Sequence, residues 1–279
     1  MAQRYASPSL KEWMRGVNLS KTTRDLMEKL SYRNGNMLFF ADTSLLMEHI
    51  PTVAEQQDIF RALSREKTIL IKICLSDDSD TYSLAEYWGR GNRAKDVFPL
   101  LDSLKRKAGD RYVDIVHLLP PFVRSRIYTY PDINSLTPET QKLYDCHWTS
   151  FNFFNTVPDN SYNTSQKIKQ HIETDFHTLT VKQDELQLGD ILLYLNNDRL
   201  LHSAVYIAAD ILFTKNGTNL SSPWMFMHMN DMEHYYACNQ PLKILYLRNK
   251  KIDLNSGKRL AKKQSSFQST EPAAFQPGI

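Results

Sequence analysis

Short apolar segments between residues 177 and 247 constrain the fold of this chain more than any other feature of its sequence. They are rich in β-branched, leucine and aromatic residues and lie at 177–181, 191–195, 202–207, 211–214 and 242–247. Segments of this length and composition, with polar turns between them, are typical of strands. Only Ala208, Ala209 and Asp210 separate the third segment from the fourth, which indicates a hairpin. The pattern therefore predicts an antiparallel sheet.

An aromatic stretch precedes these segments and carries a cysteine. Residues 145–155 read D-C-H-W-T-S-F-N-F-F-N and are expected to form a helix that packs Trp148, Phe151 and Phe154 inward. Cys146 stands at the start of this helix. Unpaired N–H groups and a partial positive charge at a helix N-terminus lower the pKa of a thiol. We therefore expect Cys146 to be a nucleophile.

A cysteine nucleophile also needs a base, and His202 is the preferred candidate. It opens the strand-like segment 202–207, where Ser203 and Ala204 are small enough to let a helix approach the sheet closely. An imidazolium within reach of the sulfur stabilises the thiolate directly. His228 and His234, in an aromatic and methionine-rich segment, are the alternative bases.

A third polar group must orient the histidine ring. Thr214 and Asn216 have the same strand parity, and Lys215 points the other way if the strand continues. An amide is a better partner for an imidazole N–H than a hydroxyl, so Asn216 is favoured. Thr214 and His228 remain open for this role.

Other residues around Cys146 are expected to contact the substrate. Tyr130 could offer a hydroxyl near the oxyanion, and the Cys146 backbone N–H is the other expected donor. His147 is adjacent to Cys146, but neighbours on a helix point about 100° apart, so His147 is expected to flank the site. Trp148 is expected either to pack in the core or to line the wall of a substrate groove, with equal weight for the two.

These residues resemble a known family. Cysteine after aspartate at a helix start, then glycine-aspartate opening a strand, then H-S-A-V-Y-I, is similar to the NlpC-like branch of the papain-like cysteine peptidases. The matching pieces are Asp145-Cys146, Gly189-Asp190-Ile191-Leu192 and the segment 202–207. The resemblance covers roughly residues 128–248.

The resemblance implies an α+β fold in which an antiparallel sheet packs against the nucleophile helix. It also implies hydrolysis of amide bonds in peptides, with cell-wall peptides as the usual substrates, and no metal or organic cofactor. The sequence departs from the family's pattern after the cysteine, where His147 and Trp148 replace the usual serine and glycine.

The rest of the chain is expected to form flanking regions. Residues 1–130 are expected to be a mostly helical region of unknown role, with helix starts at Ser20 and at the Thr52–Glu55 capping box. A polar connector at 131–137 marks the expected boundary of a papain-like catalytic domain at 131–248. Residues 249–279 lack periodicity and are rich in Ser, Gln and Pro towards their end, so we expect a disordered tail.

Composition excludes several classes of function. The net charge of +3 is too small to indicate a nucleic-acid partner. Three cysteines without a C-x-x-C pair predict neither a disulfide framework nor a zinc site. No run approaches the roughly 20 apolar residues that a membrane span needs. No signal peptide opens the sequence, so the default location is cytoplasmic, or outside the cell if a leader was removed.

The sequence is therefore interpreted as that of a thiol hydrolase, a peptidase or amidase, that acts on a peptide-like substrate. Cys146 would form the acyl-enzyme, His202 would act as base and acid, and Asn216 would orient His202. A non-catalytic binding module that kept the fold is the alternative from a different class. An acyltransferase with the same Cys-His pair is the other enzymatic alternative.

Overall fold

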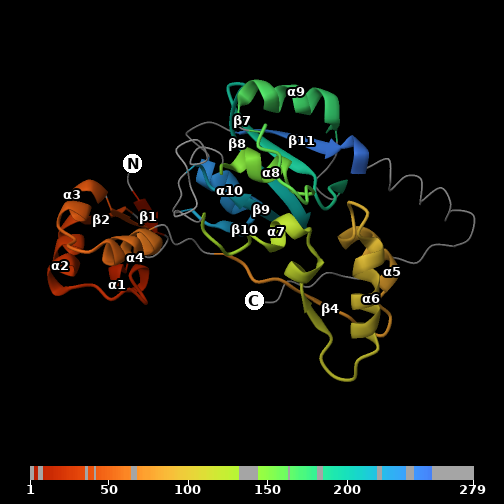
Figure 1. Ribbon diagram of the computed structural model, residues 1–279, viewed down its shortest axis with the longest axis horizontal. Coiled ribbons are helices and arrows are strands. Elements are labelled where there is room, and N and C mark those ends of the chain that lie inside the picture. Colours follow the sequence, from red (N-terminus) through yellow and green to blue (C-terminus); the bar gives the residue numbers. More distant parts are fainter. Residues whose placement is uncertain are drawn as a thin grey trace, which may run out of the picture. The chain divides into compact units, whose positions relative to one another are not determined.

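The computed structural model describes residues 3–5, 9–34, 37–40, 42–63, 68–131, 144–162, 164–180, 185–218, 222–236 and 242–252 (Figure 1). The chain divides into two compact units. The N-terminal unit comprises residues 1–67 with 220–223, and the sheet unit comprises residues 68–219 with 224–279. The boundary expected after residue 130 does not separate them, because side chains between Ile71 and Ile127 share one apolar core with the sheet.

The N-terminal unit combines helices with a small sheet. The helices are α1 (Leu10–Trp13), α2 (Lys21–Leu30), α3 (Thr43–Glu48) and α4 (Val53–Leu63). The antiparallel sheet has the order β1 (Gln3–Tyr5), β3 (Met37–Phe40), β2 (Ser31–Asn34). This sheet is an addition to the mostly helical region that the sequence predicts.

Both predicted helix starts in this unit are confirmed. The Ser20 hydroxyl accepts a hydrogen bond from the Thr23 N–H at 3.1 Å, and the Thr52 hydroxyl accepts one from the Glu55 N–H at 3.2 Å. Each bond satisfies an N–H that the helix itself leaves unpaired.

The sheet unit is built on six antiparallel strands. Their order is β10 (Trp224–His228), β9 (Ile211–Lys215), β8 (Arg199–Ala208), β7 (Ile191–Asn196), β11 (Lys243–Asn249), β6 (Phe176–Leu179). The predicted antiparallel sheet and its β8–β9 hairpin are confirmed. Strand β10 is not among the predicted strands.

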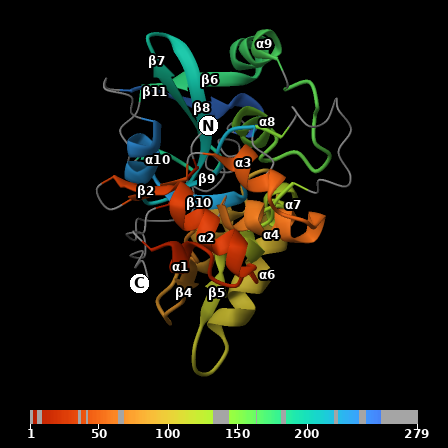
Figure 2. The same cartoon turned by 90° about the vertical axis from the view of Figure 1, so that its left-hand side faces the viewer.

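Helices cover both faces of this sheet. Helix α8 (Cys146–Phe151) packs Trp148 and Phe151 into the core on one face, where α9 (Ser165–Asp175) also contributes. Helix α10 (Met229–Tyr236) packs Met229 and Met232 against the opposite face. Figure 2 shows the strands of the sheet between α10 and α8. Side chains of alternating parity along one strand therefore face different helices.

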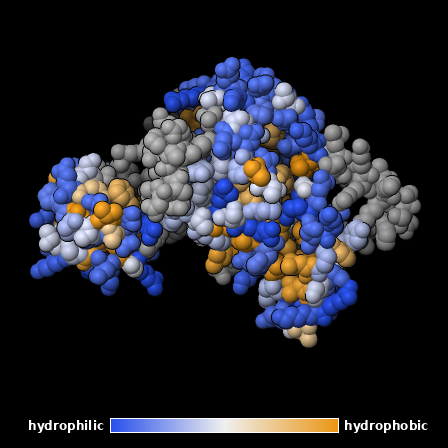
Figure 3. All heavy atoms as spheres, in the orientation of Figure 1, coloured by the Kyte–Doolittle hydropathy of each residue, from blue (hydrophilic) through white to orange (hydrophobic). Residues whose placement is uncertain are grey.

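Residues 68–131 form an additional part of the sheet unit. Helices α5 (Thr81–Trp88) and α6 (Ala94–Lys105) lie beside the β4 (Lys72–Cys74) and β5 (Tyr112–Asp114) pair, followed by a 3₁₀ turn (Ile115–Leu118) and α7 (Pro121–Arg124). Apolar side chains reach the surface around α6 and β4 (Figure 3). Leu100 and Tyr112 are among the exposed apolar residues of this region.

The turn before β7 is constrained by close packing. Gly189 has φ of +90°, and a Cβ added there would lie 2.2 Å from an atom of the Phe154 ring. Only glycine fits such a position without movement of the ring. The Phe154 ring that excludes a side chain at 189 belongs to the residues just after α8, so this turn and α8 are packed together.

Two predicted segments fall partly or wholly outside the described residues. The connector at 131–137 is outside the described residues except for Pro131, and the expected tail is outside them from residue 253 onward.

The first residues of the expected tail are described. Asn249 ends β11, and the Lys250 ammonium donates to the Thr174 carbonyl at 2.8 Å. Within the described residues, none of the helices is long and apolar enough to cross a membrane.

Candidate active site

The cysteine lies where the sequence predicts, at the first position of α8. Asp145 is the N-cap: its carboxylate accepts from the Trp148 N–H at 2.7 Å, and its carbonyl accepts from the Thr149 hydroxyl at 2.7 Å. The helix ends at Phe151, earlier than the expected Asn155. Cys146 itself is 4% exposed.

The thiol of Cys146 is protonated at rest. Burial, together with the Asp145 carboxylate, raises its pKa to about 12. The backbone N–H of Ser203 and the charge of Lys215 act in the opposite direction and favour the thiolate. A six-residue helix with an acidic cap therefore does not by itself activate this cysteine.

His202 is fully buried and is held by neighbours on the α10 side of the sheet. Its Nε2 lies 2.9 Å from the Thr214 hydroxyl, and the Tyr236 ring stacks on it with centroids 4.2 Å apart. Within the part of the chain that the structure describes, its Nδ1 is buried without a hydrogen-bond partner. Burial, and the nearby His147, lower the pKa of His202 well below its ordinary value. The ring is therefore a neutral imidazole with one nitrogen in use.

Cys146 and His202 are close in the fold but are not joined. Helix α8 covers the sheet face opposite to the one that carries the His202 ring. The thiol interacts with the N–H of Ser203, the residue next to His202. Because Nδ1 of His202 has no partner, no hydrogen bond connects the two side chains.

The residue that orients His202 is Thr214, not the favoured Asn216. Residues 214 and 216 share the parity of His202, as predicted, but the ring nitrogen points to the hydroxyl at 214. The amide oxygen of Asn216 instead accepts from the Tyr236 hydroxyl at 3.4 Å. Asn216 thus acts on the ring that stacks on His202 and does not contact the imidazole nitrogens.

The other candidate histidines are engaged elsewhere. His228 Nδ1 lies 2.7 Å from the Asp210 carboxylate, at the turn between β8 and β9. His234 Nδ1 lies 2.6 Å from the Asn230 carbonyl within α10. Neither contacts His202 or Cys146 through a hydrogen bond, so the alternatives for the base and for the third residue are not supported.

The predicted substrate-binding residues differ in their surroundings. His147 Nδ1 lies 2.9 Å from the Ser203 hydroxyl, and burial lowers the pKa of His147, so this ring fastens α8 to β8. Trp148 is 1% exposed and its indole N–H donates to Asn160, which makes it a core residue. Tyr130 is half-buried, one residue after Thr129, whose carbonyl accepts from the Trp224 N–H at 3.0 Å.

Sequence reasoning did not select Lys215, which is fully buried on the α8 side of the sheet. Its ammonium donates to the Gly217 carbonyl at 3.0 Å and lies 6.0 Å from the centroid of the Trp224 ring. Its positive charge favours the ionised forms of both Cys146 and Asp145. Strand parity correctly predicted that the Lys215 side chain points away from the face of Thr214 and Asn216. A lysine at the end of an apolar, strand-like segment was the signal that could have marked it as buried.

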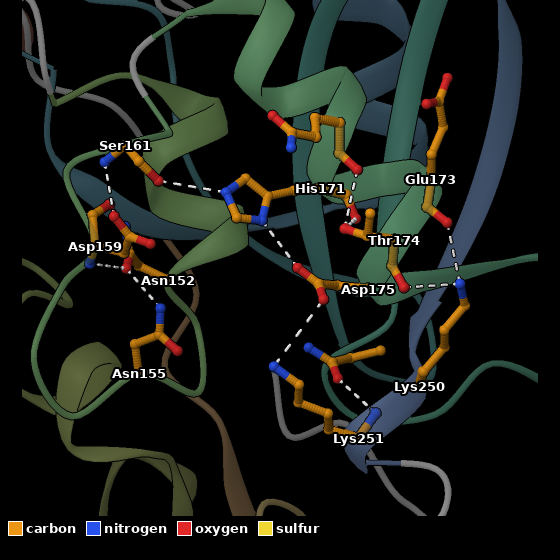
Figure 4. Close-up of polar contacts among 12 residues, drawn as sticks. Asn152, Asn155, Asp159, Ser161, His171, Glu173, Thr174, Asp175, Lys250 and Lys251 are labelled. Atoms are coloured by element: carbon orange, nitrogen blue, oxygen red, sulfur yellow. Dashed lines mark hydrogen bonds and ion pairs between the residues drawn. The ribbon is translucent and has the colours of Figure 1, made fainter.

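A polar network fixes the segment that follows α8 (Figure 4). Asn152 is fully buried: its amide donates to the carbonyls of Trp148 and Asp159, both at 3.0 Å. Its oxygen accepts from the Asp159 N–H at 2.6 Å and from the Asn155 amide at 2.8 Å. These bonds hold the C-terminal end of α8.

Figure 4 also contains a Ser–His–Asp chain, in which Ser161 precedes α9 and His171 and Asp175 lie on it. The Ser161 hydroxyl lies 3.3 Å from His171 Nε2, and His171 Nδ1 lies 2.8 Å from the Asp175 carboxylate. Hydrolytic triads have this order. However, hydrogen bonds from the N–H and hydroxyl of Ser161 lower the pKa of Asp159, so this serine is held by a second carboxylate. The Ser161 hydroxyl is therefore shared between His171 and Asp159.

Comparisons with known proteins found no counterpart: no protein-family model, no curated protein and no solved structure matches the chain. Within the described residues, no group of three or more His, Cys, Asp or Glu side chains is placed to hold a metal ion.

Proposed function

We propose that the chain is a cysteine-dependent hydrolase of amide bonds, with Cys146 as nucleophile and His202 as base. The observation that carries the proposal is the buried His202 ring. Thr214 occupies one nitrogen, and the other is unpartnered one residue away from the N–H that contacts the thiol. A buried polar atom without a partner is costly, and a base that must receive a proton needs such a free nitrogen.

The reaction begins with a neutral pair. The thiol proton passes to Nδ1 of His202 while the sulfur bonds to the substrate's carbonyl carbon. In this proposal the Cys146 N–H, at the start of α8, stabilises the oxyanion, and the charge of Lys215 acts in the same direction. His202 then protonates the leaving amine as the C–N bond breaks. Water, deprotonated by His202, finally cleaves the thioester and releases the acid.

Thr214 and Tyr236 position the base in this scheme. The Thr214 hydroxyl fixes the ring at Nε2, and the stacked Tyr236 ring prevents it from rotating. Because α8 and the His202 ring lie on opposite faces of the sheet, the thiol meets Nδ1 only if substrate binding moves α8 relative to the start of β8. Catalytic hydrogen bonds often tighten only in the substrate complex.

A specific observation favours a second function, a binding module that retains the fold. The thiol is buried, its pKa is about 12, and it makes no hydrogen bond to His202. In such a module Cys146 would be a core residue, as most buried cysteines are.

Trapping an acyl-enzyme separates these functions. We would treat the protein with p-nitrophenyl acetate and map the acetyl group by mass spectrometry. Acylation of Cys146 is expected, and His202→Ala should slow it by about 100-fold or more. Thr214→Val should slow it less, because the base remains. Exposed Cys74 is the internal control for ordinary thiol reactivity.

The result is decisive in either direction if the variants are folded, as checked by circular dichroism. Acylation of Cys74 without acylation of Cys146 would overturn the hydrolase and leave the binding module. Acylation of Cys146 that persists in His202→Ala would remove His202 from the mechanism. Added amines that capture the acyl group would indicate acyl transfer instead of hydrolysis.

A further inference from the structure

A cavity of about 100 Å³ lies where the C-terminal ends of α8, α9 and β11 meet the start of β7. Much of its wall is aromatic and comes from Phe151, Phe153, Phe154, Tyr162 and Phe176. A protein cavity of about 150 Å³ takes up one benzene molecule, so this cavity has room for roughly four to six non-hydrogen atoms. Its size therefore suits a small organic molecule.

Ser150 gives this cavity a buried polar group. The residue lines the cavity and is 1% exposed. Its hydroxyl has no hydrogen-bond partner within the part of the chain that the structure describes. A buried hydroxyl without a partner is destabilising, and a ligand that accepts a hydrogen bond from it removes that cost. The cavity therefore favours a ligand that carries an acceptor.

Two opposite charges line the same cavity. Asp175 and Lys251 point towards each other in Figure 4, with Oδ1 and Nζ 4.0 Å apart. The other carboxylate oxygen of Asp175 lies 2.8 Å from Nδ1 of His171, which fixes the carboxylate. A separation of 4.0 Å is too long for a hydrogen bond, and an ion pair whose lysine is 80% exposed is weak. A ligand can therefore bind between these two groups at little cost.

The two charges select a ligand that carries both signs. A ligand with only a negative charge would be repelled by Asp175, and one with only a positive charge would be repelled by Lys251. An α-amino acid has an ammonium group, which can donate to the Asp175 carboxylate, and a carboxylate, which can accept from Lys251 and from the Ser150 hydroxyl. Glycine and alanine have about the size that the cavity admits.

We propose that this cavity binds a small free α-amino acid between Asp175 and Lys251, with Ser150 donating to its carboxylate. The inference goes beyond the proposed function and does not rest on it. A free amino acid has no amide bond to hydrolyse, and Cys146 is not among the described residues that line the cavity.

Isothermal titration calorimetry on the full chain tests this site. L-alanine is compared with ethylamine, which lacks its carboxylate, with propionate, which lacks its ammonium, and with L-phenylalanine, which has a larger side chain. None of these probes contains an amide bond, so turnover does not interfere.

Three variants each remove one polar group from the cavity: Ser150→Ala, Asp175→Asn and Lys251→Gln. Glu173→Gln and Lys169→Gln are the matched controls, because each removes one charge from an exposed position of α9 that does not line the cavity.

Alanine should bind with a Kd of about 1 mM or tighter, and at least about 10-fold more tightly than the three other probes. Asp175→Asn should raise this Kd about 10-fold or more. Lys251→Gln should raise it about 5-fold or more, a smaller effect because the ammonium is exposed and screened. Both controls should bind like wild type.

Ser150→Ala separates binding from stability. It should raise the Kd of alanine about 5-fold or more, because the ligand loses a hydrogen bond. It should not lower the Tm of the ligand-free protein, because within the described residues the hydroxyl makes no hydrogen bond that could be lost.

Three results would overturn the amino-acid site. The first is alanine binding no tighter than ethylamine or propionate. The second is wild-type affinity in all three cavity variants. The third is a loss of affinity in the two controls as large as in the variants, because such a loss would reflect the overall charge of this surface and not the cavity.

Discussion

Replacing Asp190 with asparagine tests how the strand that follows the glycine-aspartate pair is anchored. Asp190 is 1% exposed and accepts two hydrogen bonds from the Arg248 guanidinium, at 2.9 and 2.7 Å. The same carboxylate accepts from the Gln187 N–H at 2.8 Å. The Asp190–Arg248 pair joins the turn before β7 to strand β11, and β7 and β11 are neighbours in the sheet.

The expected loss follows from the burial of both partners. Asparagine has nearly the shape of aspartate but removes the charge of Asp190 from the Arg248 guanidinium, whose side chain is only 12% exposed. Removal of one partner from a buried pair costs about 3–5 kcal/mol. The remaining exposure of Arg248 favours the lower end, so we expect a loss of about 3 kcal/mol. A unit of this size should then melt roughly 6–12 °C lower.

The assay is thermal and urea unfolding followed by circular dichroism, with a double-mutant cycle. Arg248→Met alone should be similarly destabilising, because it leaves a buried carboxylate unpaired. The double variant Asp190→Asn, Arg248→Met should recover at least about 1 kcal/mol relative to the sum of the single changes. Asp198→Asn is the matched control, since its 3.5 Å pair with Lys243 is exposed and should contribute at most about 1 kcal/mol.

A loss below about 1 kcal/mol for Asp190→Asn, similar to the exposed control, would refute the reasoning. The reasoning would also be refuted if the losses of Asp190→Asn and Arg248→Met simply added up in the double variant. Additive losses would mean that the two side chains do not stabilise each other in the folded state.

Asn152→Ala should cost about 2–3 kcal/mol in urea unfolding because it leaves buried groups unpaired; a loss no greater than that of Asn155→Ala would contradict this. Gly189→Ala should lower Tm because its φ is +90° and the Phe154 ring occupies the space of a Cβ; an unchanged Tm would show that the ring moves freely. The lowered pKa of His202 means that its contribution to stability is present above pH 6.5, the ordinary value, and is lost as pH falls below it. The free energy of unfolding measured in urea should therefore fall by up to about 1.4 kcal/mol per pH unit below pH 6.5, and less in His202→Asn; equal slopes in the two proteins would show that His202 does not titrate in this way.

Much of the sheet unit could be predicted because its signals are local. The apolar segments mark β7, β8 and β9 directly, and the Asp145 cap marks the start of α8. Strand β10 was missed because Trp224 to His228 are large apolar and aromatic residues without alternation, which also fits a helix or a packed cluster. Its pairing with β9 is a long-range property that the segment itself does not encode.

The geometry of the candidate site required information that no local pattern holds. Strand parity correctly grouped His202 with residues 214 and 216 and set Lys215 on the other face. Which helix covers each face depends on tertiary packing, so parity alone could not show that α8 and the His202 ring lie on opposite sides. The preference for an amide over a hydroxyl was reasonable chemistry, but the direction of Nε2 decided in favour of Thr214.

The protonation states of the two candidate residues determine how such a site would have to work. Burial raises the pKa of the Cys146 thiol to about 12 and lowers the pKa of His202 well below its ordinary value, so the neutral pair is favoured over the thiolate–imidazolium pair. Burial causes both pKa shifts. A movement that brings the thiol and Nδ1 together beside a polar substrate therefore favours both the thiolate and the imidazolium. The charge of Lys215 favours the thiolate. In this scheme substrate binding activates the cysteine, and free Cys146 should react with simple alkylating agents no faster than exposed Cys74 at neutral pH.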